Sequence, residues 1–308
     1  MKPLVIYHSA CPDGFTAAWV AARALGDVEL FEGRYGEEPP FELAKGRRVY
    51  IVDFSYKREK LEALHAVCAQ LPDGNELTVL DHHKTAQAEL EGLPYCTFDM
   101  DRSGAGLTWD HFHPGEPRPW IVDYVEDRDL WRFRMPDSHA LAIFIQSARY
   151  GLDEWDLMAQ LDVNDVRKTA YGCMRYLDHY CQKALQQSYQ MRVHYESCPS
   201  EPGGPSPDGL QYEDAICVNA QYLGISELLN EALTRGTRLA LGWYLDGRDG
   251  QIVVSLRSVS GMDCSEIARY YGGGGHAQAS GFRIPIDHPL ARELMTTGAS
   301  RYAVAQAD

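Results

Sequence analysis

Short apolar runs alternate with longer amphipathic segments through the first half of this 308-residue chain. The apolar runs are Leu4–Tyr7, Val49–Val52 and Leu77–Leu80. Between them, Phe15–Leu25 is rich in alanine and stops at Gly26, and Lys57–Leu71 has apolar residues at helical spacing. Short strands joined by helices predict a parallel sheet, so we expect an α/β fold.

The second half contains the strongest break in the sequence, a stretch rich in proline, glycine and serine at 198–210 that we interpret as a linker or exposed loop. Before it, the chain from Asp153 to Tyr195 is predicted to be helical. After it, we predict strands at Asp214–Ala220, Leu239–Leu245 and Ile252–Arg257, a helix at Gly224–Arg235, and a hairpin turn at Asp246–Gly250. We therefore expect an N-terminal domain at 1–135, a helical connector at 136–197, the linker, and a C-terminal domain at 211–308.

Composition and charge exclude several classes of protein. No apolar run is long enough to span a bilayer, and the N-terminus turns polar too early for a secretory signal, so we expect a cytoplasmic protein with no membrane partner. The eight cysteines form no C-x-x-C pair, which disfavours a zinc ribbon or a disulfide framework. The net charge of −15 disfavours binding of long nucleic acid, unless bound cations supply positive charge locally.

Polar residues directly follow three of the predicted strands. His8, Asp53 and Asp81 each come after an apolar run, and Asp13 and the pair His82-His83 lie on adjoining turns. Because the carboxyl ends of parallel strands meet at one edge of a sheet, we expect these side chains to lie close together. Carboxylates and imidazoles suit Mn²⁺, Fe²⁺, Co²⁺, Zn²⁺ or Mg²⁺. Two ions about 3.5–4 Å apart would share a bridging aspartate and activate a water molecule.

Each of these residues also has a structural explanation. A lone aspartate after a strand is usually a turn residue or a helix N-cap, and a lone histidine is more often a satisfied polar residue. Asp81-His82-His83 together at a strand end is a rarer pattern, and it favours a functional site. The remaining candidates are interpreted as structural: Cys68, His111, His113, His139, His179, His194 and His288.

Two further segments offer candidate ligands. The acidic stretch Val122–Trp131 contains four carboxylates, for which a solvated charged surface is the ordinary explanation. Gly272–Gly275 precedes His276, and successive glycines let backbone N–H groups approach an anion. Arg257, with Ser258 beside it, would add a bidentate phosphate contact. The alternative for the glycine run is a flexible loop.

Taken together, these residues resemble the DHH phosphoesterase superfamily with its DHH-associated C-terminal domain. Asp81-His82-His83 matches the motif that names the family, and Val49–Asp53 is similar to its second motif. Val254–Ser258 and Gly272–Phe282 resemble the two substrate-binding segments of the C-terminal domain. The resemblance implies a parallel-sheet, Rossmann-like N-terminal DHH domain that binds metal and is catalytic. It also implies a smaller mixed α/β C-terminal domain that binds substrate.

The resemblance also implies roles for individual residues. The implied metal ligands are His8, Asp13, Asp53, His82 and one aspartate of the acidic stretch. For the last we choose Asp129, because Asp129-Leu130-Trp131 is similar to an Asp-x-Trp of some oligoribonuclease-like members, with Asp127 and Asp123 next. His83 would lie beside the substrate phosphate as a hydrogen-bond donor or proton carrier, with Asp81 as the second catalytic residue. The implied substrate-binding residues are Arg257, Ser258, Gly273, Gly274, Gly275 and His276.

The first motif departs from the family, which has two aspartates separated by one residue. Here the stretch reads Cys11-Pro12-Asp13, and the following Thr16-Ala17-Ala18 aligns Asp13 with the second aspartate. Cys11 then stands in place of the first. Either its thiolate is a metal ligand, which would shift the preference toward Zn²⁺ or Fe²⁺, or it is a spectator that leaves one site weak.

The function expected from the resemblance is hydrolysis of phosphodiester bonds in short oligonucleotides or small nucleotides by metal-activated water. The expected cofactors are two divalent ions, Mn²⁺ first, with Mg²⁺, Zn²⁺, Fe²⁺ and Co²⁺ as alternatives, and a homodimer is left open. The competing hypotheses are a nucleotide-binding protein with weak or no hydrolysis and an inorganic pyrophosphatase. A Rossmann-type oxidoreductase is disfavoured because the first turn lacks G-x-G-x-x-G.

Overall fold

The computed structural model describes residues 1–68, 77–196, 210–221 and 224–296. The chain divides into two compact units, Met1–Arg175 and Tyr176–Asp308, which are described separately. Unit 1 is built on a five-stranded parallel sheet with the strand order β2-β1-β3-β4-β5. Its strands are β1 (Leu4–His8), β2 (Glu29–Gly33), β3 (Val49–Val52), β4 (Leu77–Asp81) and β5 (Cys96–Phe98).

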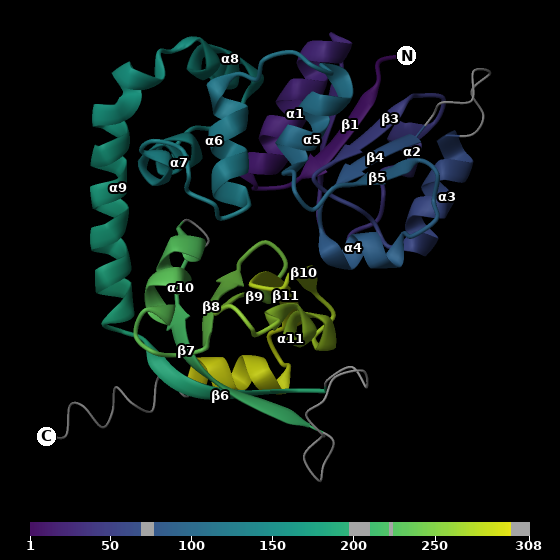
Figure 1. The fold of residues 1–308 in the computed structure, drawn as a ribbon. Coiled ribbons are helices and arrows are strands. Elements are labelled where there is room, and N and C mark those ends of the chain that lie inside the picture. Colours follow the sequence, from purple (N-terminus) through teal and green to yellow (C-terminus); the bar gives the residue numbers. More distant parts are fainter. Residues whose placement is uncertain (69–76, 197–209, 222–223, 297–308) are drawn as a thin grey trace, which may run out of the picture. The chain divides into compact units, whose positions relative to one another are not determined.

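Helices cover both faces of this sheet (Figure 1). Because side chains alternate along a strand, Val5 and Tyr7 of β1 face one core, whereas Leu4 and Ile6 face the other. The helices of unit 1, the last of which continues into unit 2, are α1 (Pro12–Leu25), α2 (Phe41–Ala44), α3 (Arg58–Cys68), α4 (Lys84–Glu89), α5 (Gly104–Phe112), α6 (Trp120–Asp129), α7 (Ser138–Gln146), α8 (Leu152–Gln160) and α9 (Val163–Leu185). Helices α1, α5 and α6 pack on the Val5 face, and α3 packs on the Leu4 face. The central strands are therefore buried on both sides, as expected for a parallel sheet.

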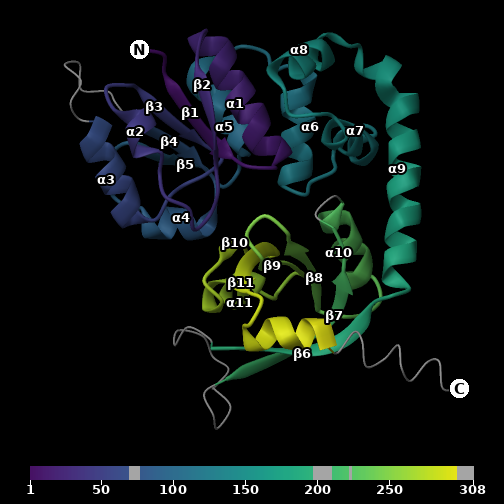
Figure 2. The ribbon, with the colours of Figure 1, turned by 180° about the vertical axis from the view of Figure 1, so that it is seen from behind.

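Unit 2 contains a six-stranded mixed sheet with the order β10-β11-β9-β8-β7-β6, in which β7 and β8 are parallel and the other neighbours antiparallel. Its strands are β6 (Tyr189–Tyr195), β7 (Gln211–Asn219), β8 (Leu239–Asp246), β9 (Gln251–Ser258), β10 (Gly274–His276) and β11 (Ala279–Pro285). Helix α11 (Cys264–Tyr270) and the helix at 289–296, yellow in Figure 2, pack into the core on one face. Helix α10 (Ile225–Leu233) packs against β8.

The predicted fold class is confirmed: unit 1 has a parallel sheet between helices, and unit 2 has a mixed sheet. The hairpin predicted at Asp246–Gly250 joins β8 to β9, and the Gly250 N–H donates to the Asp246 carbonyl at 2.9 Å. Of the helices in the described ranges, none combines the length and apolar character needed to cross a bilayer.

One structural prediction is wrong. The segment expected to end the long helical region is strand β6, in which Tyr189, Met191, Val193 and Tyr195 point into the core while their neighbours face outward. This alternation is the signature of a strand, and the tyrosines and valine also favour one. Part of the glycine run is strand, because Gly274–His276 pairs with Ala279–Gly281 as a hairpin, so the alternative of a flexible loop does not hold for the whole run.

The domain boundaries expected from the sequence remain a prediction. The proposed linker lies outside the described residues except for Leu210, as does the end of the helix predicted at Lys57–Leu71. The two units meet in sequence at Arg175, inside α9, whereas the expected connector covered 136–197.

Candidate metal centre

The carboxyl ends of β1, β3 and β4 place His8, Asp53 and Asp81 at one edge of the sheet of unit 1. Asp53 follows β3 directly and has a φ of 54°, in the left-handed region that non-glycine residues rarely adopt. Strained backbone of this kind persists only where the surroundings enforce it, and it is concentrated at functional sites.

The carboxylate of Asp53 lies between two imidazoles that come from different strands. Its Oδ1 is 3.0 Å from Nε2 of His82, and its Oδ2 is 3.5 Å from Nδ1 of His8. The two carboxylate oxygens of Asp53 therefore face two different imidazoles.

The first group, which we call the Cys11 centre, consists of His8, Cys11 and Asp53. The second, the Asp129 centre, consists of Asp13, His82 and Asp129. Within each group the ligand atoms lie within 4.8 Å of one another. In the Asp129 centre, His82 Nε2 is 3.6 Å from Asp13 Oδ2 and 3.5 Å from Asp129 Oδ2. The structure thus brings together all six residues predicted as metal ligands.

Buried polar atoms at these centres lack hydrogen-bond partners among the described residues. They are Nδ1 of His8, Oδ2 of Asp53 and Oδ2 of Asp129. Burial of such atoms without a partner costs free energy, and several carboxylates in one buried site repel each other. Divalent cations would satisfy both requirements, so the donor atoms present fit metal ions.

The pKa values of the site reflect the crowding of its carboxylates. Burial, followed by the charges of Asp53 and Asp129, raises the pKa of Asp13 well above its usual range. Burial also opposes ionisation of Asp53, but the neighbouring imidazoles of His8 and His82 outweigh it and hold the Asp53 pKa well below normal. Burial, together with the neighbouring carboxylates, raises the pKa of the Cys11 thiol. A cation at either centre would replace these protons.

Asp13 is held by the start of a different helix. Its Oδ2 accepts from the Gly104 N–H at 2.6 Å, and its Oδ1 accepts from the Ala105 N–H at 2.9 Å, both at the N-terminus of α5. Carboxylates are favoured at helix N-termini because the unpaired N–H groups and the helix dipole attract negative charge. Gly14 lets α1 approach β1, since a Cβ there would lie 2.5 Å from the His8 carbonyl oxygen.

Asp81 has its oxygens occupied by hydrogen bonds that orient His83. Ser55 Oγ donates to Asp81 Oδ2 at 2.5 Å, and Asp81 Oδ1 lies 2.7 Å from Nδ1 of His83. The backbone N–H of His82 also donates to Oδ1 at 2.8 Å. Burial alone would lower the pKa of His83, but Asp81 outweighs it and raises that pKa, which favours a protonated ring. These contacts let Asp81 orient the His83 ring, and the catalytic roles of the two residues remain predictions.

The three aspartates considered in the acidic stretch differ in their contacts. Asp129, at the end of α6, lies beside His82. Asp127 instead accepts from the backbone N–H groups of Arg134 and Met135 at 3.0 and 3.1 Å, which holds the turn after α6. Asp123 lies 4.0 Å from Arg118 and in none of the ligand groups. The geometry therefore separates Asp129 from the two alternatives.

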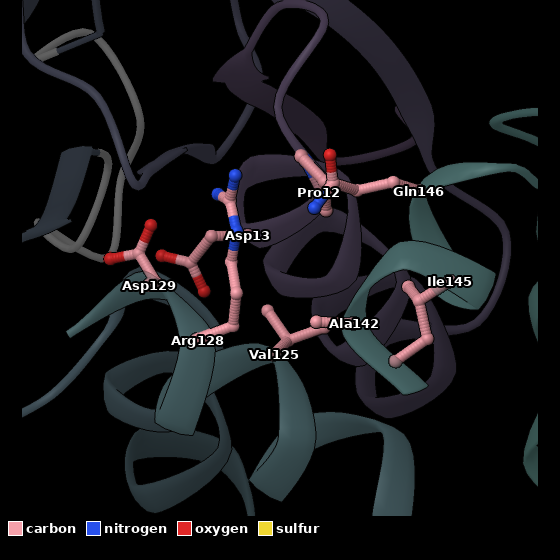
Figure 3. Close-up of a pocket in the computed structure, with 8 residues that line it drawn as sticks. All are labelled: Pro12, Asp13, Val125, Arg128, Asp129, Ala142, Ile145 and Gln146. Carbon is pink, nitrogen blue, oxygen red and sulfur yellow. The ribbon is translucent and has the colours of Figure 1, made fainter. Parts of the chain in front are cut away.

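A cavity of about 10 Å³, comparable to one water molecule, adjoins the Asp129 centre. Figure 3 shows the carboxylates of Asp13 and Asp129 next to each other among the residues that line it, with Arg128 beside them. Arg128 therefore brings a positive charge to the edge of the site.

The predicted substrate-binding residues lie together in unit 2. Arg257 of β9 donates from Nη2 to Ser226 Oγ at 2.6 Å and from Nη1 to the Leu256 carbonyl at 2.7 Å. Ser258 is buried and donates to the Met262 carbonyl, so its hydroxyl holds a turn. The Gly273 N–H donates to the Ala268 carbonyl at 2.7 Å. Arg257, Ser258 and Gly273 thus use these groups in internal hydrogen bonds, and the phosphate role of all six predicted residues remains a prediction.

Sequence reasoning missed three residues beside the metal ligands. They are Ser55, Arg128 and Tyr35, whose half-exposed ring lies 5.3 Å from the His8 ring and 6.1 Å from the His83 ring. Ser55 lies two residues after Asp53, and Arg128 directly precedes Asp129. This closeness in sequence to predicted ligands is the signal that could have identified them. Cys68 and the six histidines interpreted as structural belong to no ligand group within the described ranges.

Comparison with known proteins gives a match at both sequence and fold level. Residues 223–295 match the DHHA1 domain family. The chain is 26% identical over 312 residues to uncharacterized protein R106 of Acanthamoeba polyphaga mimivirus, which covers 90% of this chain and 66% of that protein. The chain therefore spans less than two thirds of that relative's length.

Two solved structures share the fold. The DHH domain of a member of a ribosomal protein family is 13% identical, with a TM-score of 0.58, and the alignment covers 98% of this chain and 86% of that one. RecJ from Thermus thermophilus in complex with Mn²⁺ is 15% identical, with a TM-score of 0.51, over 98% of this chain and 52% of that one. At these identities the likeness concerns the fold alone.

Proposed function

We propose that the chain is a divalent-metal-dependent phosphoesterase, because residues 223–295 match the DHHA1 domain family and the fold is similar to that of a DHH domain. We further propose that it hydrolyses phosphodiester bonds of short oligonucleotides or small nucleotides. The observation that carries it is the position of Asp53, whose two carboxylate oxygens lie 3.0 and 3.5 Å from imidazole nitrogens of two different groups of candidate ligands.

The cations would activate a water molecule and neutralise charge on the phosphate. Asp53 holds both centres at a fixed separation, and Asp13 is fixed by the N-terminus of α5. His83, oriented by Asp81 and Ser55, donates a hydrogen bond to the phosphate or a proton to the departing oxygen. Arg128, beside Asp13 and Asp129, offsets negative charge that develops during the reaction.

Substrate anchoring is assigned to unit 2. Arg257 and His276 provide a guanidinium and an imidazole for a second phosphate of the substrate. The net charge of −15 favours short substrates, because a track for long nucleic acid would require a basic surface. Mn²⁺ is the first ion to test, since a structure with the same fold is a complex with Mn²⁺. A cytoplasmic location and a homodimer stay predictions.

The test uses metal-free, full-length protein reconstituted with Mn²⁺, Mg²⁺, Zn²⁺ or Co²⁺. The substrates are a chromogenic phosphodiester, linear dinucleotides, cyclic dinucleotides, a 3′,5′-bisphosphonucleotide and pyrophosphate. We expect metal-dependent release of mononucleotide from the linear dinucleotides. Tight binding of dinucleotides by the metal-loaded protein with no turnover would instead identify a binding protein, and turnover of pyrophosphate alone would identify a pyrophosphatase.

A further inference from the structure

The two proposed metal centres differ in their donor atoms. The Cys11 centre offers a sulfur, an imidazole nitrogen and one oxygen of Asp53. The Asp129 centre offers an imidazole nitrogen and carboxylate oxygens from Asp13 and Asp129. Thiolate ligands select soft or borderline ions such as Zn²⁺, whereas carboxylates suit Mn²⁺ and Mg²⁺.

Cys11 is directed to this site by the local fold. It is the N-cap residue of α1, and Pro12 begins the helix, so the backbone changes direction directly after β1. Two donor atoms next to it fit a cation. Oδ2 of Asp53 is buried and lies 3.5 Å from Nδ1 of His8, and neither atom has a hydrogen-bond partner among the described residues. A single sulfur atom does not identify a metal site. The buried oxygen of Asp53 and the buried nitrogen of His8 are independent observations that also favour one.

The other described cysteines do not share this setting. Cys68, Cys181, Cys217 and Cys264 are buried, and Cys96 and Cys173 are partly buried. Within the described ranges, Cys11 alone among the cysteines belongs to a group of clustered ligand atoms.

We infer that the two centres bind different metals: a thiophilic ion at Cys11, His8 and Asp53, and Mn²⁺ or Mg²⁺ at Asp13, His82 and Asp129. As the thiophilic ion binds, the thiol proton of Cys11 passes to solvent and a metal–sulfur bond forms. Asp53 would lie between the two ions, and the chain would then hold a mixed-metal pair. This inference rests on the proposed two-cation site.

The test follows metal binding directly. Metal-free, full-length protein is titrated with Co²⁺ while the near-ultraviolet thiolate-to-cobalt charge-transfer band is recorded. We expect a band that saturates at one equivalent of Co²⁺ and that Zn²⁺ displaces while excess Mg²⁺ does not. Cys11→Ser should lose the band and still bind metal at the Asp129 centre, whereas Cys173→Ser, the matched control, should retain it.

A second variant separates loss of a ligand from loss of folding. Cys11→Asp supplies an oxygen donor at the same position. It should lose the band and shift the ratio of Zn²⁺ to Mn²⁺ affinity toward Mn²⁺ by roughly 10-fold or more, because even outer-shell changes alter metal affinity by about 10–100-fold. Far-ultraviolet circular dichroism confirms that each variant is folded.

The result that overturns the inference is a wild-type protein without the band, or a band that survives Cys11→Ser. Failure of the proposed function looks different, because the spectrum does not depend on turnover. A normal band without hydrolysis of any substrate in the panel would overturn the function and leave the mixed-metal pair standing. Hydrolysis without the charge-transfer band would support the proposed function and overturn the mixed-metal pair.

Discussion

Gly104 and Asp53 are so close that a Cβ added to Gly104 would lie 2.3 Å from the Cβ of Asp53. The residues are far apart in sequence, one at the start of α5 and the other after β3. Their contact lets the N-terminus of α5 reach Asp13 while Asp53 keeps its position between His8 and His82.

Gly104→Ala should therefore displace Asp53 and weaken both metal centres. We expect a loss of about 1–3 kcal/mol in the free energy of unfolding, typical of overpacking, and fewer bound metal ions per chain. Urea denaturation and elemental analysis of the purified protein measure the two effects. The control is Gly172→Ala in α9, where nothing lies near the added methyl group. A Gly104→Ala protein with normal metal content would show that α5 and Asp53 adjust independently.

His82→Ala should remove a nitrogen that faces three carboxylates. Because loss of an outer-shell partner alone typically costs about 10–100-fold in metal affinity or activity, we expect a larger decrease in both here. Metal analysis and turnover of a chromogenic phosphodiester provide the measurement, with His179→Ala on the exposed side of α9 as control. Normal metal content together with normal turnover would contradict the assignment.

Ser55→Ala should lower kcat without lowering metal content. The change removes the hydroxyl that donates to Asp81 Oδ2 and so loosens the support of His83. We expect a decrease in kcat of about 10-fold, at the lower end of the effect of an orienting partner. Ser55→Thr, which keeps a hydroxyl, should restore most of the rate. Loss of bound metal in step with kcat would mean that Ser55 supports the metal centres instead.

Arg257→Ala should raise KM more than it lowers kcat, because it removes a charged hydrogen-bond donor proposed to hold a distal phosphate. The expected loss of binding free energy is about 1.5–3 kcal/mol. The comparison is between a linear dinucleotide and a chromogenic phosphodiester that has no second phosphate, and only the former should be affected. Arg192→Ala, which breaks an exposed pair with Asp214, is the control. Equal KM changes for both substrates would place Arg257 outside phosphate anchoring.

Asp246 should make the free energy of unfolding of unit 2 depend on pH. Hydrogen bonds from Arg248 and Arg283 hold the pKa of this carboxyl well below its usual range. Because the pKa of Asp246 is lower in the folded state than its unfolded value of about 3.9, the ionised carboxylate stabilises the fold above this pH. The contribution is lost as the pH falls from about 3.9 toward the folded-state pKa. Asp246→Asn should therefore destabilise the protein near neutral pH, with a difference from wild type that shrinks on acidification. Thermal unfolding across this pH range tests it, with Asp178→Asn as control; a constant difference would contradict it.

Local patterns predicted the central strands well. The runs beginning at Leu4, Val49 and Leu77 are continuous apolar segments, and burial on both faces requires that pattern. The sequence did not predict the edge strands, because β2 is mostly only partly buried and contains two glutamates, and β5 has only three residues. Strand β6 was assigned to a helix because the long helix α9 precedes it closely.

The residues of the candidate site, like the strands, were predicted only in part. His8, Asp53 and Asp81 were predicted from their positions after strands, since the edge of a parallel sheet follows from strand direction alone. This pattern does not show that the residues of Asp81-His82-His83 have different contacts. The oxygens of Asp81 are occupied by Ser55 and His83, whereas His82 faces three carboxylates. Which aspartate of the acidic stretch approaches His82 depends on where α6 ends.

The sequence by itself determined the parallel α/β fold, the edge at which ligands gather, and the presence of a cysteine where oxygen donors prevail. The fold and the edge follow from hydrophobic periodicity and from the order of residues at strand ends, which are local properties, whereas the unusual cysteine is implied by the resemblance of its motif to a family. Only the tertiary structure decided that Asp53 lies between two groups of donors, that α5 holds Asp13, and that Asp129 rather than Asp127 completes the second group. Those relationships join segments distant in sequence, and their distances are set by the packing of helices on the sheet.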